Sequence, residues 1–599
     1  MTGFRGSGVD LPLRLAIPAL ALAILLGGAV SPAQPLVGDS SVGQPLQLLP
    51  PGRAVPPEPR PDKVAITTLS PLDGASIGLL DASEGGFGAN PWRGAGRAEV
   101  AALIDVLPVG APSAAMQELM RRVLVISAPP PEGPAVIPSL LGVRATKLRQ
   151  LGRTEDLIAL AGAGLIVRQD ETATRAIVEA LLQSGRLSGA CSELRGVAHR
   201  YTGRFWQEGL VLCQAVAGEA AAARLGLNLL RERQADDTAL YALAEALTEG
   251  ANPALPASVW QRLRDPEPLL LAALAETGLA VPANAAAGVD DPGRLVAIAT
   301  GTVNPPQRRI EAGERAVAAG AITSATLMDL YATAEFRAAD LADAIDRATD
   351  WQGPRARALL VQAAAAADEP AEAYRHYELA LALTRAENAP LGVFLALLDA
   401  LPPGPEGAGF AADAARAYYA AGDLENAVAW HEIAASAGRN DRDRAALIRL
   451  WPLAVLAGAF DDGVASGGAV AYARNISEWL DAEFAVAGEA GTYSAAMTLA
   501  AFDALGEPID SALWRRVRID DSRDNASLPS AGLWWRMPSA AADGQVGLVA
   551  LMALIALGDQ GPAHASPALL ERVLSAMVAA GLEGDARRLG REAIWASQL

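Results

Sequence analysis

Short apolar-rich segments with helical periodicity follow one another along most of the chain and are separated by glycine or proline. From about residue 97 onward, such segments begin after capping residues such as Asp170 and Ser566 and end at glycines. Serine or aspartate at the N-cap and glycine just after the last turn are the usual limits of a helix. The pattern therefore predicts an all-α protein.

Four of the glycines recur at nearly constant spacing. Gly152, Gly185, Gly218 and Gly250 are 33, 33 and 32 residues apart, and each lies between two predicted helices. Small or apolar residues follow each glycine at the fifth and ninth positions. A fixed period near 33–34 residues with two helices per unit indicates an α-solenoid, here of about twelve helical hairpins, because a single hairpin must stack on neighbours to bury its apolar faces.

The clearest unit is AADAARAYYAAGDLENAVAWHEIAASAG, residues 411–438. It resembles a tetratricopeptide repeat, and His431 stands where that family usually has an aromatic residue. Weaker copies are DEPAEAYRHYELALAL, residues 368–383, and GLEGDARRLGREAIWA, residues 581–596. The resemblance implies helix-packing roles for Ala415, Tyr418, Gly422, Ala427 and Ala434.

The N-terminus has the pattern of a targeting segment. Arg5 and Arg14 precede an apolar run over residues 15–30, and Ser-Pro-Ala follows it, ending at Ala33. This is the outline of a secretory signal peptide. The run is short for the roughly 20 residues of a membrane-spanning helix, and an uncleaved anchor is the alternative. The expected organisation is a signal peptide or N-terminal anchor (1–33), a Pro-rich disordered linker (34–63), a Gly-rich cap segment with a short strand or two (64–96), a solenoid (97–505), an irregular insertion (506–545) and C-terminal helical repeats (546–599).

The chain has only two cysteines, Cys191 and Cys213. Export would place them in an oxidising compartment, where an even cysteine count predicts a disulfide. Their midpoint falls in the break at Tyr201–Gly203, so two antiparallel helices turning there would carry both cysteines at the same height. Gly189 and Gly209 would permit the Cα approach below about 7 Å that a disulfide requires. We expect a structural disulfide between the second helix of one unit and the first helix of the next.

Charge is unevenly distributed. Residues 151–599 carry 37 Lys and Arg against 57 Asp and Glu, whereas residues 1–150 are nearly neutral. An acidic body of this size repels phosphate backbones, which argues against nucleic acid as a partner. The concave wall of an acidic solenoid would instead prefer basic partners.

Candidate catalytic and metal-binding residues do not form a constellation. None of the four histidines has a second histidine three or four positions away, and no HExxH occurs. The paired aspartates fall between predicted helices, where aspartate caps helix starts. We therefore expect no cofactor and no metal, structural roles for His376 and His431, no catalytic role for His199 between the two cysteines, and capping roles for the aspartate pairs (Asp236-Asp237, Asp290-Asp291, Asp461-Asp462, Asp520-Asp521).

A second family resemblance bears on function. The repeat region is similar to the exported helical superhelix of soluble lytic transglycosylases, but the C-terminal region lacks the Glu-Ser and glycine-rich signature of their catalytic domain. The resemblance therefore implies architecture and not that activity. The best candidate binding loop carries Trp534 and Trp535, because exposed tryptophans often anchor partners.

These patterns together predict a non-enzymatic, exported scaffold that binds a protein or peptide in the bacterial periplasm. It would contact a membrane only through an uncleaved anchor, which would hold it on the inner membrane facing the periplasm. The alternative function is an accessory of peptidoglycan or envelope-polymer metabolism that binds glycan on its concave face. The small number of aromatic residues, 11 Trp, 9 Tyr and 9 Phe, argues against a glycan groove.

Overall fold

The structure is a computed structural model. It describes residues 73–162, 167–233, 238–250, 255, 260, 265–283, 285, 287–438, 441–460, 475–488, 491–507, 509–517 and 529–598. All of these belong to one compact unit, Ser70–Leu599. The predicted signal peptide and Pro-rich linker lie outside the described residues.

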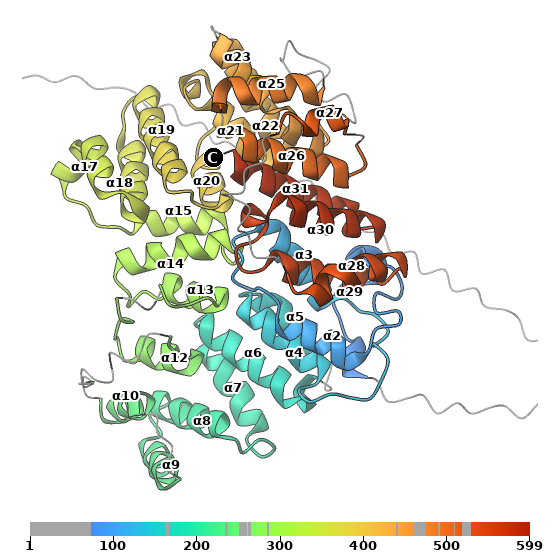
Figure 1. The fold of residues 1–599 in the computed structure, drawn as a ribbon. Helices are drawn as coiled ribbons and strands as arrows, with labels where there is room; N and C mark the ends of the chain where they lie inside the picture. Colours follow the sequence, from blue (N-terminus) through green and yellow to red (C-terminus); the bar gives the residue numbers. More distant parts are fainter. Residues whose placement is uncertain are drawn as a thin grey trace, which may run out of the picture. The chain divides into compact units, whose positions relative to one another are not determined.

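The described chain is helical throughout, with no strand in it, which confirms the all-α prediction (Figure 1). The helices of its first half are α1 (Ala82–Gly85), α2 (Arg97–Asp105), α3 (Ala114–Val125), α4 (Leu140–Gln150), α5 (Thr154–Gly162), α6 (Glu171–Gln183), α7 (Leu187–Val197), α8 (Arg204–Val216), α9 (Ala220–Glu232), α10 (Thr238–Glu249), α12 (Pro268–Glu276), α13 (Pro292–Thr300) and α14 (Pro306–Ala318).

The second half continues in the same manner. Its helices are α15 (Ser324–Ala332), α16 (Ala338–Ala342), α17 (Ala344–Trp351), α18 (Gly353–Ala366), α19 (Pro370–Ala386), α20 (Leu391–Leu398), α21 (Ala411–Ala421), α22 (Leu424–Ala437), α23 (Asp441–Ile448), α24 (Trp451–Leu456), α25 (Ile476–Ala487), α26 (Gly491–Ala504), α27 (Ser511–Trp514), α28 (Ala531–Ala542), α29 (Val546–Leu557), α30 (Pro567–Ala579) and α31 (Glu583–Ser597). Consecutive helices often pack as hairpins, for example α18 with α19 and α21 with α22.

Each of the four periodic glycines follows the end of a helix, and the first three lie between the two helices of a hairpin. Gly152 follows α4, Gly185 follows α6, Gly218 follows α8 and Gly250 follows α10, and all four have a positive φ between 64° and 74°. The left-handed conformation costs other residues roughly 1–2 kcal/mol, so glycine is favoured there. The sequence period is thus a period of helix ends, and the fold is that of a helical-repeat-like protein.

A disulfide between Cys191 on α7 and Cys213 on α8 confirms the predicted pairing. The two Cα atoms are 5.6 Å apart, and both residues are buried. Gly209 on α8 lies against Leu194 on α7, and a Cβ at this glycine would come within 2.9 Å of the leucine side chain. The bond joins the hairpin α6–α7 to the next hairpin, α8–α9.

The segment that resembles a tetratricopeptide repeat forms the hairpin α21–α22. Gly422 lies between the two helices with a left-handed φ of 86°. His431 is fully buried, and its Nδ1 lies 3.2 Å from the Tyr419 hydroxyl. The other residues to which the resemblance gives packing roles are also buried, namely Ala415, Tyr418, Ala427 and Ala434.

The C-terminal helices pack against the N-terminal ones. Helix α29 contacts α2 and α3, and α31 contacts α3 (Figure 1). Two ion pairs link the same regions, Arg122 with Asp585 and Arg536 with Glu99. Residues separated by more than 400 positions are therefore neighbours, which the local sequence period does not indicate.

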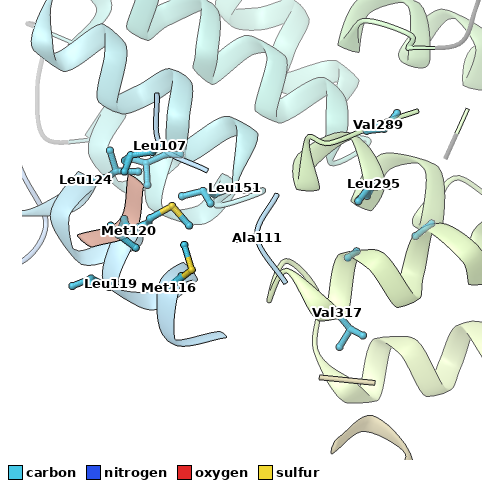
Figure 2. Close-up of a cluster of buried hydrophobic side chains, with 14 of the residues drawn as sticks. Leu107, Ala111, Met116, Leu119, Met120, Leu124, Leu151, Val289, Leu295 and Val317 are labelled. Atoms are coloured by element: carbon cyan, nitrogen blue, oxygen red, sulfur yellow. The ribbon is translucent and has the colours of Figure 1, made fainter. Parts of the chain in front are cut away.

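The loop between α2 and α3 lies against α13 and α14. Figure 2 shows Ala111 of this loop between the side chains of α3 and α4, such as Met120, and those of the α13–α14 region, such as Leu295. The buried Gln117 side chain donates hydrogen bonds to the carbonyl oxygens of Val109 and Ala111, at 2.9 and 3.0 Å. These bonds fix the course of the loop.

The Gly-rich cap segment was expected to contribute a strand or two. Its described part, residues 73–96, contains a short 3-10 helix (Gly74–Ser76), α1 and only isolated bridges at Leu80 and Gly96, so the strand prediction is wrong for these residues. Phe87 and Trp92 from this segment are buried.

The prediction of a loop around Trp534 and Trp535 is also wrong, because both residues lie on α28. Pro538 is inside this helix and has no N–H to donate to the carbonyl oxygen of Trp534, four residues earlier. The Arg572 side chain donates to that oxygen instead, at 3.2 Å. The proline that looked like a helix breaker is therefore accommodated by a neighbouring helix.

Candidate functional site

Two adjoining cavities lie where four segments of the chain meet. These segments are the loop and first turn of α3, the end of α14, the start of α20, and the stretch from residue 559 through α31. The first cavity has a volume of about 330 Å³ and is mostly apolar, and we call it the apolar chamber. The second, of about 770 Å³, is lined by several carboxylates, and we call it the acidic chamber. Both chambers are lined by Pro112, Ala318, Ala389, Pro390 and Gln560.

Glu592 of α31 connects the C-terminal wall of the apolar chamber to the start of α3. Its carboxylate accepts hydrogen bonds from the Ser113 hydroxyl and from the backbone N–H of Ala115, the latter at 2.9 Å. The first N–H groups of a helix lack partners within the helix and carry partial positive charge, so a carboxylate stabilises this end. Burial raises the pKa of Glu592, and the two hydrogen bonds oppose that change.

Two glycines allow the walls to approach each other closely. A Cβ at Gly392 of α20 would lie 2.9 Å from the carbonyl oxygen of Val317 on α14. A Cβ at Gly110 would lie 2.9 Å from the carbonyl oxygen of Asp290. Real Cβ atoms do not approach backbone oxygen this closely without displacement, so glycine is needed at both positions for this arrangement of the walls.

The guanidinium of Arg591, beside the apolar chamber, is bound to backbone groups of the protein. Its guanidinium donates to the carbonyl oxygens of Ala420 and Leu456, at 3.1 and 3.0 Å, which lie in the last turns of α21 and α24. Helix C-termini carry partial negative charge that a cation stabilises. Burial lowers the pKa of Arg591 to about 10. The rest of this chamber's lining is mainly apolar and includes Ala115, Leu391, Leu395, Pro562 and Trp595.

The acidic chamber has four carboxylates and one arginine in its lining. Glu314 is buried and paired with Arg357 of α18, and it accepts a hydrogen bond of 2.6 Å from the Tyr331 hydroxyl. Asp290 lies 3.4 Å from Arg315. The two remaining carboxylates, Glu311 and Asp559, form no ion pair with any residue that the structure describes.

Most of the residues that sequence reasoning singled out lie outside these chambers. Trp535 is 70% exposed on α28, and Arg572 lies over the rings of both Trp534 and Trp535, at 5.3 and 6.0 Å from their centroids. Neither tryptophan lines a chamber, and neither do the two cysteines. Among the histidines, His564 lies at the apolar chamber.

One of the four aspartate pairs, Asp290-Asp291, lies among the described residues. Asp291 caps α13 by accepting from the Arg294 N–H, as predicted, and it also forms a buried ion pair with Arg149 at 2.7 Å. The other three pairs, which begin at Asp236, Asp461 and Asp520, lie outside the described residues.

The sequence did not predict which residues form the chambers, because contacts between distant parts of the chain bring these residues together. One available signal was Trp595, a large aromatic within the weak C-terminal repeat copy. Another was the presence of proline and small residues in the connecting loops, such as residues 559–567, which contain Pro562 and Pro567. Neither pattern indicates which distant segment lies opposite.

Comparison of the chain with protein-family models finds no match, and comparison with curated proteins finds none either. The described residues include no helix long and apolar enough to cross a membrane. They also include no cluster of three or more His, Cys, Asp or Glu side chains arranged to hold a metal ion. The fold thus defines a class, an all-α helical-repeat-like protein, and the two chambers are a candidate site in the described part of the chain.

Proposed function

We propose that the protein is a non-enzymatic helical-repeat scaffold of the bacterial cell envelope that binds a segment of a partner protein or peptide. The observation that carries this proposal is the pair of adjoining chambers, which four distant segments build together. Their volumes fall within the roughly 300–1,000 Å³ typical of ligand sites. Helical-repeat proteins commonly bind peptides and proteins on surfaces formed by stacked hairpins.

The chemistry of the chamber walls supports a peptide ligand. Alanine, proline and leucine side chains cover most of the apolar chamber, and amide side chains lie at Asn388 and Gln560. Amides donate and accept hydrogen bonds, as an extended peptide backbone requires of its binding site. The close wall contacts at Gly110, Gly392 and Glu592 favour a preformed site, which lowers the entropy lost on binding.

Location in the periplasm is part of the same proposal. It is supported by the signal-peptide pattern of residues 1–33 and by the disulfide, since disulfides persist mainly in oxidising compartments. Retention of an uncleaved N-terminal anchor, with the folded unit facing the periplasm, is the alternative placement.

Capture of partners from envelope extracts tests the proposal. The full chain serves as bait beside Ala389→Trp, which places an indole in the wall common to both chambers, and beside Ala221→Trp on the exposed face of α9 as the control. We expect a protein partner that the wild type and Ala221→Trp retain and that Ala389→Trp loses. Equal capture by all three baits would reject the chambers as the binding site.

Glycan binding is the second candidate, and the exposed ring of Trp535 favours it, because aromatic rings offer flat apolar faces to ligands. In the chambers themselves the described lining includes one indole, Trp595, which is almost fully buried. Recovery of glycan without protein, and its loss in Trp535→Ala, would replace peptide binding by glycan binding.

A further inference from the structure

The two chambers differ in charge although they adjoin. In the apolar chamber, the described charged side chains have partners in the protein: Glu592 binds the start of α3, and Arg591 binds the ends of α21 and α24. Glu118 lies near Arg121 and Arg122, at 3.7 and 3.9 Å. Arg588 lies 3.6 Å from Asp585, so a ligand group entering this chamber meets mainly the apolar side chains of alanine, leucine and proline.

The acidic chamber presents an excess of negative charge to a ligand. Glu314 is neutralised by Arg357, and Asp290 by Arg315. Glu311 and Asp559 form no ion pair with a described residue, although Lys147 lies within electrostatic range of Asp559; Glu311 accepts a hydrogen bond from the neutral Gln307 amide at 2.8 Å. Two carboxylates in one cavity that are not held in an ion pair repel each other, and a cation bound in that cavity relieves this repulsion.

The wall shared by the chambers carries no charged side chain. Its five residues, Pro112, Ala318, Ala389, Pro390 and Gln560, offer small apolar surfaces and one amide side chain. A backbone in extended conformation fits such a surface, because alternate side chains leave it in opposite directions. One ligand chain could thus place one side chain in each chamber.

We propose that the ligand is a peptide segment in which a lysine or arginine lies close in sequence to a bulky apolar residue. The basic side chain occupies the acidic chamber beside Glu311 and Asp559, and the apolar side chain occupies the apolar chamber beside Trp595. The ligand backbone crosses the shared wall at Gln560. This inference rests on the proposed function, because it specifies the ligand of the same site.

Selection from a phage-displayed library of random decapeptides, on immobilised full-length protein, tests the inference. The enriched peptides are synthesised with a fluorescein label, and their affinities are measured by fluorescence anisotropy. The key variant is Glu311→Gln/Asp559→Asn, which keeps side-chain size while removing both charges. Its matched control is Glu425→Gln/Asp346→Asn, which removes two exposed carboxylates outside the chamber linings.

We expect enriched peptides to combine a basic residue with Leu, Phe, Ile or Trp. Their affinity should fall about tenfold in Glu311→Gln/Asp559→Asn, in the range found for charge pairs at interfaces, and stay unchanged in the control pair. Replacing the basic residue of the peptide by glutamate should lower affinity for the wild type more than for the double variant.

Two other outcomes separate this inference from the proposed function. Enriched peptides without a basic residue, whose binding Ala389→Trp abolishes, would overturn the inference and leave peptide binding in the chambers standing. Peptides that bind the wild type and Ala389→Trp equally, or a selection with no enrichment, would overturn both. Unfolding curves of each variant, measured in parallel, show that any loss of binding occurs in folded protein.

Discussion

The N-terminal hairpins, α4 to α10, and the C-terminal helices, α21 to α31, are built from similar elements but are held together differently. Neighbouring N-terminal hairpins are linked by a disulfide and by exposed ion pairs such as Arg168 with Glu193, and one buried ion pair, Arg149 with Asp291, joins α4 to the start of α13. In the C-terminal helices, a buried ion pair joins residues about one repeat apart, Arg449 with Glu483, which are 34 positions apart. Arg591 reaches carbonyl groups 135 and 171 positions away.

The difference shows what a sequence period can encode. A constant period places each hairpin against the next, and small residues and glycines are sufficient for that task. Contacts between distant segments have no period to set them, so they depend on individual side chains whose loss leaves a buried group without its partner. The chambers lie where such distant contacts meet, and their shape therefore depends on a few single residues.

The largest expected effect is on a buried ion pair of the C-terminal helices. Glu483 is 1% exposed and accepts hydrogen bonds from Arg449 and Ser494. Glu483→Ala leaves the Arg449 guanidinium buried without its carboxylate, and we expect a loss of about 3–5 kcal/mol in the free energy of unfolding in urea. Glu193→Ala, in the exposed N-terminal pair, should cost less than about 1 kcal/mol. Equal losses would remove the distinction between the two regions.

The disulfide gives the next largest effect, confined to the N-terminal hairpins. Cys191 and Cys213 are separated by 22 residues, and closing a loop of this length stabilises by roughly 3 kcal/mol in the chain-entropy model. In Cys191→Ala/Cys213→Ala we expect faster amide hydrogen exchange in α7 and α8, with exchange in α21 and α22 unchanged. Faster exchange in both regions would mean that the two regions unfold as one unit.

The loss of stability in acid should also differ between the two regions, because the buried His431 lies in the C-terminal helices. Burial lowers the pKa of His431 to about 4, against 6.5 in the unfolded chain. The unfolded state therefore binds more protons between these values, and stability is lost as pH falls from about 6.5 to 4, by about 1.4 kcal/mol per pH unit. His431→Phe should remove up to roughly 3 kcal/mol of this loss, measured as the change in unfolding free energy between pH 7 and pH 4.

A matched variant controls for the general effect of acid. His199 is exposed near the end of α7, and His199→Phe serves as the control for the loss of an imidazole outside the core. If both variants flatten the slope equally, the acid sensitivity does not come from the burial of His431.

The features that the sequence predicted correctly depend on residues close together in the chain, and those it missed depend on contacts between distant segments. The glycine period and the cysteine pairing were predicted correctly because the residues concerned lie within a few tens of positions of one another. The chambers were not predicted, because contacts such as that of Ser113 with Glu592 span 479 positions, and no local sequence pattern indicates such contacts. The tryptophan loop was wrong for a related reason: the hydrogen bond from Arg572 that accommodates Pro538 comes from another helix.

The smallest expected effect on stability comes from replacing either of two glycines that end helices. Gly185 and Gly422 both have a left-handed φ, of 71° and 86°, but a Cβ at Gly185 would meet nothing within 4 Å, whereas one at Gly422 would lie 2.5 Å from Nη2 of Arg591. Alanine at either site should lower the free energy of unfolding by about 1 kcal/mol, because it would have to adopt the left-handed backbone conformation. Gly422→Ala should cost about 1–2 kcal/mol more in urea unfolding, since the arginine is held by two helix ends and cannot move away freely.

That excess should disappear when the arginine is shortened. In an Arg591→Met background, the cost of Gly422→Ala should fall to that of Gly185→Ala, because the colliding guanidinium is gone. An excess that persists without the guanidinium would place the strain in the backbone of the α21–α22 hairpin itself. The glycine at the end of α21 would then act as the periodic N-terminal glycines do, through local conformation alone.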